Sequence, residues 1–304
     1  MAHQSDVLRY ITLDVFTTSR YAGNPLALVL VPPGQDVSIE YMQRTAREFN
    51  YSETVFLYEL GDADVRIGAE WRMRIFTVDA ELSFAGHPTI GTASYVLALL
   101  SRGTSAEINA LLRCNAGVID ISRKDNDIWA SIPHDFHIHD TAKISRQHVL
   151  EAQPDLNDTS IRAVDVVSPV KGMTFMVTEL VSLEALAAVA ITGKRPSLEL
   201  DAGWNEGFVG TAYYVKTAEN TYRTRMIEKI FEDPATGSMS CGLATLLAIR
   251  SKSKVVELSF VQGIEMGRKS EIGVCVMLHD DLKTLKHLKL KGSAVKVMEG
   301  SIFL

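Results

Sequence analysis

Two glycine turns, each followed by an apolar segment with helical character, are the features of this sequence best suited to chemistry. The first turn is Gly86-His87-Pro88 and the second is Gly237-Ser238. A helix N-terminus presents unpaired backbone N–H groups and partial positive charge, which suit a carboxylate or a developing oxyanion. Two such helix starts that face each other would form an anion-binding cleft. Two ordinary helices, in which Ser238 caps N–H groups and Pro88 occupies the first helical position, would produce the same pattern.

Two carboxylates could supply acid/base chemistry beside these turns. Glu53 stands in Ser52-Glu53-Thr54, where a strand is expected to begin, and Asp233 stands in the loop that leads to Gly237. In a cleft that excludes water, burial would raise the pKa of Glu53 and make it a general acid/base. Taken alone, Glu53 is better explained as a solvated charge. Asp233 could bind a substrate amine or hydroxyl, or it could simply hold its turn.

A group of histidines suggests an alternative function, that of a metal-dependent hydrolase. His134, His137 and His139 are accompanied by Asp135 and Asp140. On a strand, His137 and His139 would share one face and form a pair of metal ligands. Because no second ligand motif supports a metal, we favour a solvated polar linker as the explanation of these residues.

The composition excludes several classes of protein. The chain has 304 residues, of which 46% are hydrophobic and 22% charged, and its formal net charge of -6 comes without a dense run of Lys and Arg. A nucleic-acid-binding protein would normally have a basic face. The three cysteines are far apart, which argues against a disulfide framework. The N-terminus lacks an apolar signal core, and no apolar run approaches the roughly 20 residues of a membrane span. We therefore expect a cytoplasmic protein without nucleic-acid or membrane partners.

The elements that must position these residues can be predicted from periodicity. Alternating or β-branched stretches predict strands, and they are Tyr10–Phe16, Leu26–Val31, Glu53–Tyr58, Glu70–Phe76, Val118–Ser122 and Ile128–Ile132. Ser38 predicts the N-cap of an amphipathic helix that runs to Phe49. The segments Pro88–Leu100 and Met239–Ile249 contain no charged residue. A helix that is polar on no face is normally buried all round. Each half should therefore wrap its strands around a central helix, in an α+β fold.

The second half of the chain repeats the order of the first. Asp14 is echoed by Asp165, Arg74 by Arg225 and Gly86 by Gly237, and the residue numbers differ by 151 in every pair. A fixed offset over three separated segments indicates an ancient duplication. We expect an N-terminal lobe over residues 1–145 and a C-terminal lobe over residues 146–304, with the last strand able to cross back to the first lobe.

Several short motifs follow one another in order along nearly the whole chain. They are Gly23-Asn24-Pro25, Ser52-Glu53-Thr54, Arg74-Ile75-Phe76-Thr77, the segment from Ala85 to Ala93, the segment from Glu232 to Ser238, and Gln262-Gly263 with Gly267-Arg268. In order and spacing they resemble the phenazine-biosynthesis-like (PhzF-like) family. The resemblance implies a diaminopimelate-epimerase-like fold, in which two pseudo-symmetric lobes each form a curved, mostly antiparallel sheet or barrel around a central apolar helix.

The same resemblance implies a function. It implies an isomerase that moves a proton within a small carboxylated substrate without a cofactor or a metal. The prototype of the family converts a dihydro-hydroxyanthranilate to its ketone tautomer. By this resemblance Glu53 is the catalytic acid/base, and His87, Asp233 and Ser238 are its companions around the substrate. Gly86 and Gly237 would offer backbone donors to the substrate carboxylate. A homodimer is also implied.

The chain departs from the epimerases of this fold, which use paired thiols before the two helices. The matching places here hold Ala85 in the first half and Ala235-Thr236 in the second. Cys241 lies inside the second helix, and its counterpart in the first helix is Ile90. A two-cysteine racemase is therefore not expected. A protein that binds a small molecule but has lost its catalytic activity is the remaining alternative within this fold.

Overall fold

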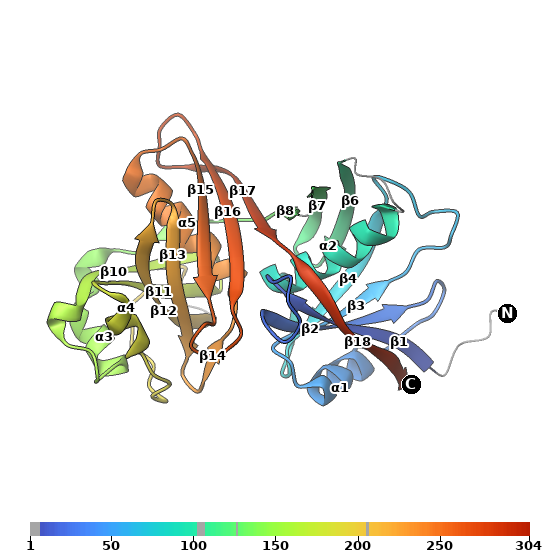
Figure 1. Cartoon of the computed structure of the whole chain (residues 1–304), viewed down its shortest axis with the longest axis horizontal. Helices are drawn as coiled ribbons and strands as arrows, with labels where there is room; N and C mark the ends of the chain where they lie inside the picture. The colour runs from blue at the N-terminus through green and yellow to red at the C-terminus, as the bar shows by residue number, and fades with distance from the viewer. Residues whose placement is uncertain (1–6, 102–106, 126, 205–206) are drawn as a thin grey trace. The chain divides into compact units, whose positions relative to one another are not determined.

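The computed structural model in Figure 1 describes residues 7–101, 107–125, 127–204 and 207–304. The chain divides into two compact units. Unit 1 consists of the residues up to Ile132 together with Leu290–Leu304, and unit 2 consists of Pro133–Lys289. The division thus falls before residue 145, where we expected the lobes to join, because His137 and Ile138 pair with a strand of unit 2.

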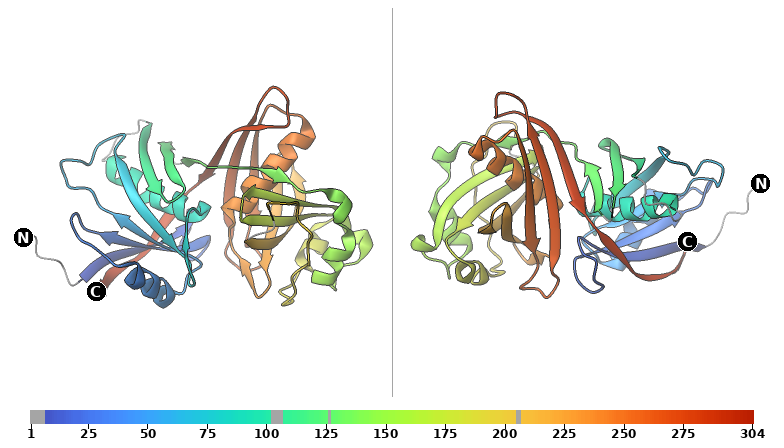
Figure 2. Two further views of the ribbon diagram at one scale, coloured as in Figure 1. Left: turned by 180° about the vertical axis from the view of Figure 1, so that it is seen from behind. Right: turned by 45° about the horizontal axis from the view of Figure 1, so that its top comes forward.

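Unit 1 is a mixed, mostly antiparallel sheet with two helices. Its strands are β1 (Val7–Val15), β2 (Asn24–Val31), β3 (Thr54–Tyr58), β4 (Glu70–Phe76), β5 (Glu81–Leu82), β6 (Ile108–Cys114), β7 (Gly117–Lys124), β8 (Asp127–Ser131) and β18 (Ala294–Phe303), and its helices are α1 (Ile39–Phe49) and α2 (Gly86–Ser101). The last strand, β18, pairs antiparallel with β1, as the views of Figure 2 show from two further sides. β17 (Leu285–Gly292) brings the chain back from unit 2 to unit 1.

Unit 2 has the same kind of sheet. Its strands are β9 (His137–Ile138), β10 (Ile161–Val170), β11 (Met173–Leu180), β12 (Phe208–Ala218), β13 (Thr221–Glu228), β14 (Phe231–Asp233), β15 (Val255–Gln262) and β16 (Ser270–Leu278). Its helices are α3 (Arg146–Ala152), α4 (Leu183–Ala187) and α5 (Gly237–Ser251), with 3-10 turns η1 (Thr141–Lys143) and η2 (Asp158–Ser160).

The order of strand pairing is the same in both units. In unit 1, β1 pairs antiparallel with β2, β2 parallel with β3, β3 antiparallel with β4, β4 parallel with β6 and β6 antiparallel with β7. In unit 2 this sequence of pairings recurs through β10, β11, β12, β13, β15 and β16. The apolar helix stands in the same place in each series, α2 before β6 and α5 before β15. The duplication predicted from the sequence offset is therefore a duplication of structure.

The two apolar helices are buried against the strands of their own units. α2 packs on β1, β2, β6 and β8, and α5 packs on β10, β15 and β16. A glycine at the same point of each helix permits this close approach. A Cβ added to Gly91 would lie 2.9 Å from Val15 Cγ2, and one added to Gly242 would lie 3.0 Å from Pro169 Cγ. Both contacts are too close for a larger residue without displacement of the strand side chains.

Local signals predicted the bounds of α1 correctly. Ser38 is the N-cap of α1 and its Oγ accepts a hydrogen bond from Tyr41 N at 3.1 Å, while Asn50 ends the helix in the left-handed conformation. α1 lies over the core of unit 1 that contains Val29, Phe56 and Phe76. α2 begins at Gly86, earlier than the Pro88 start that we predicted. Among the described residues, no helix combines the length and apolarity that a membrane span requires.

Candidate active site

Glu53 and His87 form a buried pair in unit 1. Glu53 directly precedes β3, whose first residue, Thr54, lies between Ala27 of β2 and Phe76 of β4. His87 is the second residue of α2, and only 4% of its side chain is exposed. The Oε2 atom of Glu53 lies 3.5 Å from Nδ1 of His87. The start of a central strand and the start of the buried helix thus bring a carboxyl group and an imidazole together.

The surroundings of Glu53 raise the pKa of its carboxyl group toward neutral pH. Burial raises the pKa of Glu53 to about 7, and a hydrogen bond from the Ser52 side chain opposes this shift only partly. Within the described part of the chain, Oε2 has no hydrogen-bond partner. The side chain keeps 16% of its surface exposed. A carboxyl group that is half ionised near pH 7 can both accept a proton and return it.

The first turn of α2 is compatible with anion binding. Gly86 and His87 are buried, and Pro88 has no N–H to leave unpaired. Thr89 closes the turn, since both its backbone N and its Oγ1 donate to the carbonyl oxygen of Ala85, the latter at 2.7 Å. The first backbone N–H groups of a helix have no intrahelical acceptor. The sixteen-residue α2 therefore places its positive end beside Glu53 and His87.

The corresponding turn of unit 2 is held by Asp233. Its Oδ2 accepts a hydrogen bond from Thr236 Oγ1 at 2.7 Å, and its Oδ1 accepts one from Ala235 N at 3.4 Å. Thr236 is the N-cap of α5, so Gly237 and Ser238 are the first two residues of the helix. Ser238 is thus half-buried inside the first turn and is not the capping residue that we had considered. The turn-holding role of Asp233, one of the two alternatives from the sequence, is present in the structure.

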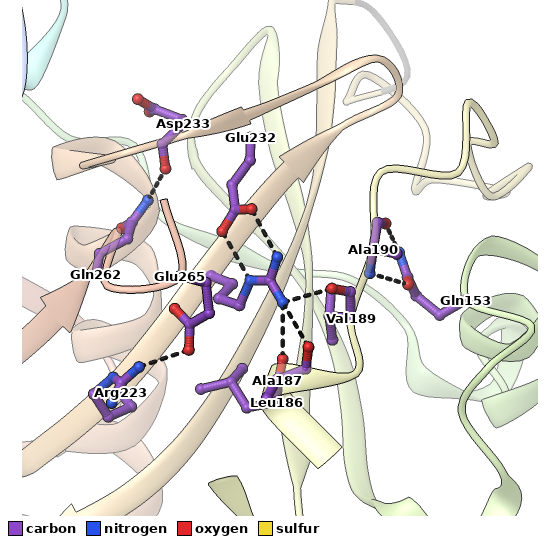
Figure 3. A network of polar contacts seen from close by, with 11 residues as sticks. Gln153, Leu186, Ala187, Val189, Ala190, Arg223, Glu232, Asp233, Gln262 and Glu265 are labelled. Atoms are coloured by element: carbon purple, nitrogen blue, oxygen red, sulfur yellow. Dashed lines mark hydrogen bonds and ion pairs between the residues drawn. The ribbon is translucent and has the colours of Figure 1, made fainter. Parts of the chain in front are cut away.

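Gln262 is a residue of this turn whose role sequence reasoning missed. It is fully buried at the end of β15, and its Nε2 donates to Asp233 O at 2.7 Å (Figure 3) and to Thr236 Oγ1 at 2.9 Å. Its Oε1 accepts from Thr236 N at 3.2 Å. The next residue, Gly263, has a φ of 73°, and a Cβ there would lie 2.7 Å from Pro234 O. In the Gln262-Gly263 motif, Gln262 therefore binds the turn by hydrogen bonds, and Gly263 allows the chain after β15 to lie directly against it.

An arginine–glutamate pair, half-buried in unit 1 and buried in unit 2, precedes each helix. Arg74 of β4 makes two hydrogen bonds to Glu81 of β5, at 2.8 and 2.6 Å, and Arg225 of β13 makes two to Glu232 of β14, at 2.8 and 2.7 Å. The numbers of both arginines and of both glutamates differ by 151. Arg225 also donates to backbone carbonyls at the end of α4, and Figure 3 shows these acceptors, which belong to Leu186, Ala187 and Val189. These bidentate pairs fix the hairpins from which α2 and α5 begin.

The predicted site residues fall into two groups. Glu53, Gly86 and His87 lie together in unit 1, and Asp233, Gly237 and Ser238 lie together in unit 2. The histidines considered as metal ligands separate as well. His137 and His139 gather with Asp201, a residue that the sequence did not associate with them, while His134 and Asp140 are outside this group.

Comparison with known proteins identifies the family. The model of the phenazine biosynthesis-like protein family matches residues 13–300. An uncharacterised isomerase of Mesorhizobium japonicum is 33% identical, over 97% of this chain and 98% of the relative. The trans-2,3-dihydro-3-hydroxyanthranilate isomerase of Pseudomonas aeruginosa is 30% identical, over 87% of this chain and 88% of the relative.

Solved structures show the same fold. A phenazine biosynthesis protein of the PhzF family from Bacillus anthracis has a TM-score of 0.77 at 22% identity, over 98% of this chain and 99% of that one. A hydroxyproline epimerase from Agrobacterium vitis has a TM-score of 0.62 at 12% identity, over 99% of this chain and 93% of that one. The expected diaminopimelate-epimerase-like α+β fold is thereby confirmed. The match to the family model and the 33% identical relative show that this chain belongs to the phenazine biosynthesis-like protein family.

Proposed function

We propose that this protein is a cofactor-independent isomerase that moves a proton within a small carboxylated substrate, with Glu53 as the general acid/base. The observation that carries the proposal is the buried Glu53 carboxyl, whose pKa is raised to about 7 and whose Oε2 lies 3.5 Å from His87 Nδ1. The isomerase names of relatives that are 28 to 33% identical support the same class of reaction.

In the proposed reaction, the ionised form of Glu53 removes a proton from a carbon of the substrate. The electron pair that is left behind delocalises into an adjacent unsaturated system, and the neutral acid returns the proton to a different carbon. No atom is gained or lost, so no redox cofactor enters the balance. A group whose pKa is near the working pH serves both halves of such a reaction. Because 16% of the Glu53 side chain is exposed, the neutral acid can also exchange its proton with solvent before it protonates the second carbon.

The other predicted residues are assigned to binding and orientation. We propose that the backbone N–H groups of Gly86 and Gly237 bind the substrate carboxylate in a cleft between the lobes, because helix starts favour negative charge. His87 and Ser238 would contact the substrate beside these donors. Asp233 is assigned to a substrate amine or hydroxyl. Its oxygens accept from Ala235 N and Thr236 Oγ1, and a carboxylate oxygen can accept more than one hydrogen bond.

The substrate class follows from the relatives and from this chemistry. Trans-2,3-dihydro-3-hydroxyanthranilate, the compound in the names of the Pseudomonas relatives, carries a carboxylate, an amine, a hydroxyl and an unsaturated ring. These groups match an anion-binding helix start, an acceptor carboxylate and a proton carrier. We therefore propose a carboxylated, partly unsaturated ring compound as the substrate, and the named compound as the first probe.

Deuterium incorporation tests the assignment of Glu53. Wild-type protein in deuterated buffer should isomerise the probe and place deuterium at the carbon that receives the proton, as seen by NMR and mass spectrometry. Glu53→Gln should lower this rate about 10²- to 10⁴-fold, the usual contribution of a positioned general acid/base. Glu48→Gln, the same change at an exposed site on α1, is the matched control and should retain full activity.

Two results would contradict the proposal in different ways. Full isomerisation by Glu53→Gln would remove Glu53 as the acid/base. Saturable binding of the probe to the wild type without any isomerisation or exchange would instead favour a binding protein that retains the fold.

A further inference from the structure

The strongest feature that the proposed reaction does not use is a group of three metal-binding side chains in unit 2. His137 lies on β9, His139 follows it two residues later, and Asp201 joins them from a segment far along the chain. The ligand atoms of the three residues all lie within 4.8 Å of one another. No other group of this kind occurs among the residues that the structure describes.

The strand geometry explains why the two histidines meet. β9 pairs antiparallel with β10, with His137 opposite Ser168 and Ile138 opposite Val167. Successive side chains of a strand point to opposite faces, so residues 137 and 139 lie on one face and Ile138 on the other. The rings of His137 and His139 are 4.8 Å apart. Pairing with β10 therefore fixes the spacing of the two imidazoles.

The hydrogen bonds of His139 identify its tautomer. Its Nδ1 accepts a hydrogen bond from the backbone N of Asp201 at 3.2 Å, so this nitrogen carries a lone pair and no proton. The proton is then on Nε2, which donates to Ser168 Oγ at 2.9 Å, and Ser168 in turn bonds Thr174 Oγ1 at 2.7 Å. A hydrogen bond from the second ring nitrogen to a polar group is the usual arrangement of a metal-bound histidine.

The carboxylate of Asp201 faces the same space. Its Oδ2 lies 2.8 Å from His137 Nε2 and 3.8 Å from His139 Nδ1. The lone pair of His139 and the negative oxygen of Asp201 thus approach each other, an arrangement that a cation between them would stabilise. Zinc bonds of about 2.0–2.2 Å to nitrogen and oxygen allow one ion to span two ligand atoms up to about 4 Å apart.

We propose that His137, His139 and Asp201 form a binding site for a divalent transition-metal ion, of which zinc is the first choice. Imidazole nitrogen and carboxylate oxygen are ligands that zinc accepts in proteins. His139 is almost fully buried, but 31% of His137 and 27% of Asp201 are exposed, so an ion can enter from solvent. Binding would replace the hydrogen bonds from Asp201 N to His139 and between His137 and Asp201.

Trp204 supplies a reporter for this site. Its ring is stacked on that of His137, with centroids 4.6 Å apart and planes 10° from parallel. The chain has three tryptophans, and the other two, Trp71 and Trp129, belong to unit 1. A Cu²⁺ or Co²⁺ ion bound by His137 should therefore quench the fluorescence of Trp204 selectively.

Metal titration of the whole chain tests the proposal. Wild-type protein freed of metal by a chelator should bind one equivalent of Zn²⁺ by calorimetry, and one equivalent of Co²⁺ should quench part of its tryptophan fluorescence. His137→Ala and Asp201→Asn should each weaken binding at least tenfold. His134→Ala is the matched control, because His134 is close in sequence but outside the group, and it should bind as the wild type does. Trp204→Phe should keep the stoichiometry and lose the quenching.

Three results would overturn the proposal. They are the absence of zinc binding by the wild type at micromolar ion concentrations, unchanged affinity in both His137→Ala and Asp201→Asn, and loss of binding in His134→Ala, which would place the ion elsewhere. Circular dichroism of each variant separates a lost ligand from a lost fold. None of these readouts depends on isomerase activity.

Discussion

At the start of α2, the Glu53 carboxyl is buried beside His87, and its Oε2 has no hydrogen-bond partner in the described part of the chain. At the start of α5, the carboxylate of Asp233 accepts hydrogen bonds through both oxygens, from Ala235 N and Thr236 Oγ1. The two helix starts occur in the same series of strand pairings. The difference teaches that duplication preserved the backbone frame, while the carboxyl groups beside the two helix starts differ in their hydrogen bonding.

The register of the strands identifies what stands at the equivalent positions. Phe76 and Ile227 are counterparts at the offset of 151. Thr54 lies opposite Phe76 in unit 1 and Thr211 lies opposite Ile227 in unit 2, so the preceding residues, Glu53 and Gly210, are counterparts in this register. A Cβ on Gly210 would lie 3.0 Å from the ring of Phe175. Unit 2 therefore fills with an aromatic ring the space in which unit 1 holds its carboxyl group.

The arginine pairs offer the sharpest test of how far the two units remain equivalent. The side chains of Arg225 and Glu232 are 7% and 5% exposed, whereas those of Arg74 and Glu81 are 14% and 20% exposed. Glu232→Gln leaves a buried guanidinium without its counter-charge and should cost about 3–5 kcal/mol of unfolding free energy. Glu81→Gln should cost about half of that, because solvent screens the more exposed pair. Urea unfolding of both variants measures the difference, and equal losses would contradict it.

The pH dependence of stability isolates the buried carboxyl of unit 1. The pKa of Glu53 is about 7 in the folded protein and near its ordinary value of 4.5 in the unfolded chain. Between these values the folded state binds more protons, so ionisation of Glu53 lowers the unfolding free energy as the pH rises from about 4.5 to 7. Glu53→Gln should therefore be as stable as the wild type near pH 4 and more stable by about 3 kcal/mol at pH 8.

Thermal or urea unfolding at several pH values provides this comparison. Glu48→Gln, which removes an exposed carboxyl from α1, should show no such pH-dependent gain. A stability difference between Glu53→Gln and wild type that is independent of pH would show that burial does not shift the ionisation of Glu53.

Substitution of Gln262 tests what holds the turn between Asp233 and Gly237 in unit 2. Arg72 and Arg223 are counterparts at the offset of 151. Arg72 pairs with Arg113 and Arg223 pairs with Val261, so the residues that follow, Cys114 and Gln262, are also counterparts. Gln262→Met keeps the length of the side chain but removes its bonds to Asp233 O, Thr236 N and Thr236 Oγ1. Loss of partners for these buried groups should cost about 1–3 kcal/mol in urea unfolding. A loss below about 0.5 kcal/mol would mean that the turn does not depend on Gln262.

The two serines near helix starts should give the smallest effect and a clear contrast. Ser38 accepts a hydrogen bond from Tyr41 N as the N-cap of α1, and its replacement by Ala should cost about 1 kcal/mol. Ser238 lies within the first turn of α5, where Thr236 is the cap, so Ser238→Ala should change the unfolding free energy by less than about 0.5 kcal/mol. A larger loss for Ser238→Ala than for Ser38→Ala would reverse this assignment of the caps.

Features that depend on local pattern were predictable from the sequence. The burial of both apolar helices, the bounds of β4 and the Ser38 cap follow from periodicity and capping rules. The duplication was visible because three pairs of residues share one offset. The same offset relates Glu81 to Glu232, so the sequence also contains the pattern of the paired salt bridges.

Contacts that join distant segments were not predictable. Gln262 reaches the turn at Asp233 only because β15 lies parallel to β13, and Asp201 reaches His137 across more than sixty residues. The raised pKa of Glu53 also depends on burial by surrounding elements, which no feature of Ser52-Glu53-Thr54 itself reveals. The residue types indicated the chemistry, while the three-dimensional environment determined the pKa of the Glu53 carboxyl group.

Direct titration of the Glu53 carboxyl tests the central claim most simply. Carboxyl carbon NMR of protein labelled at glutamate, with the Glu53→Gln variant to assign the resonance, reports the ionisation of this group without a substrate. The structure predicts a midpoint at about pH 7. A midpoint near the ordinary value of 4.5 would contradict the assignment of Glu53 as the proton carrier.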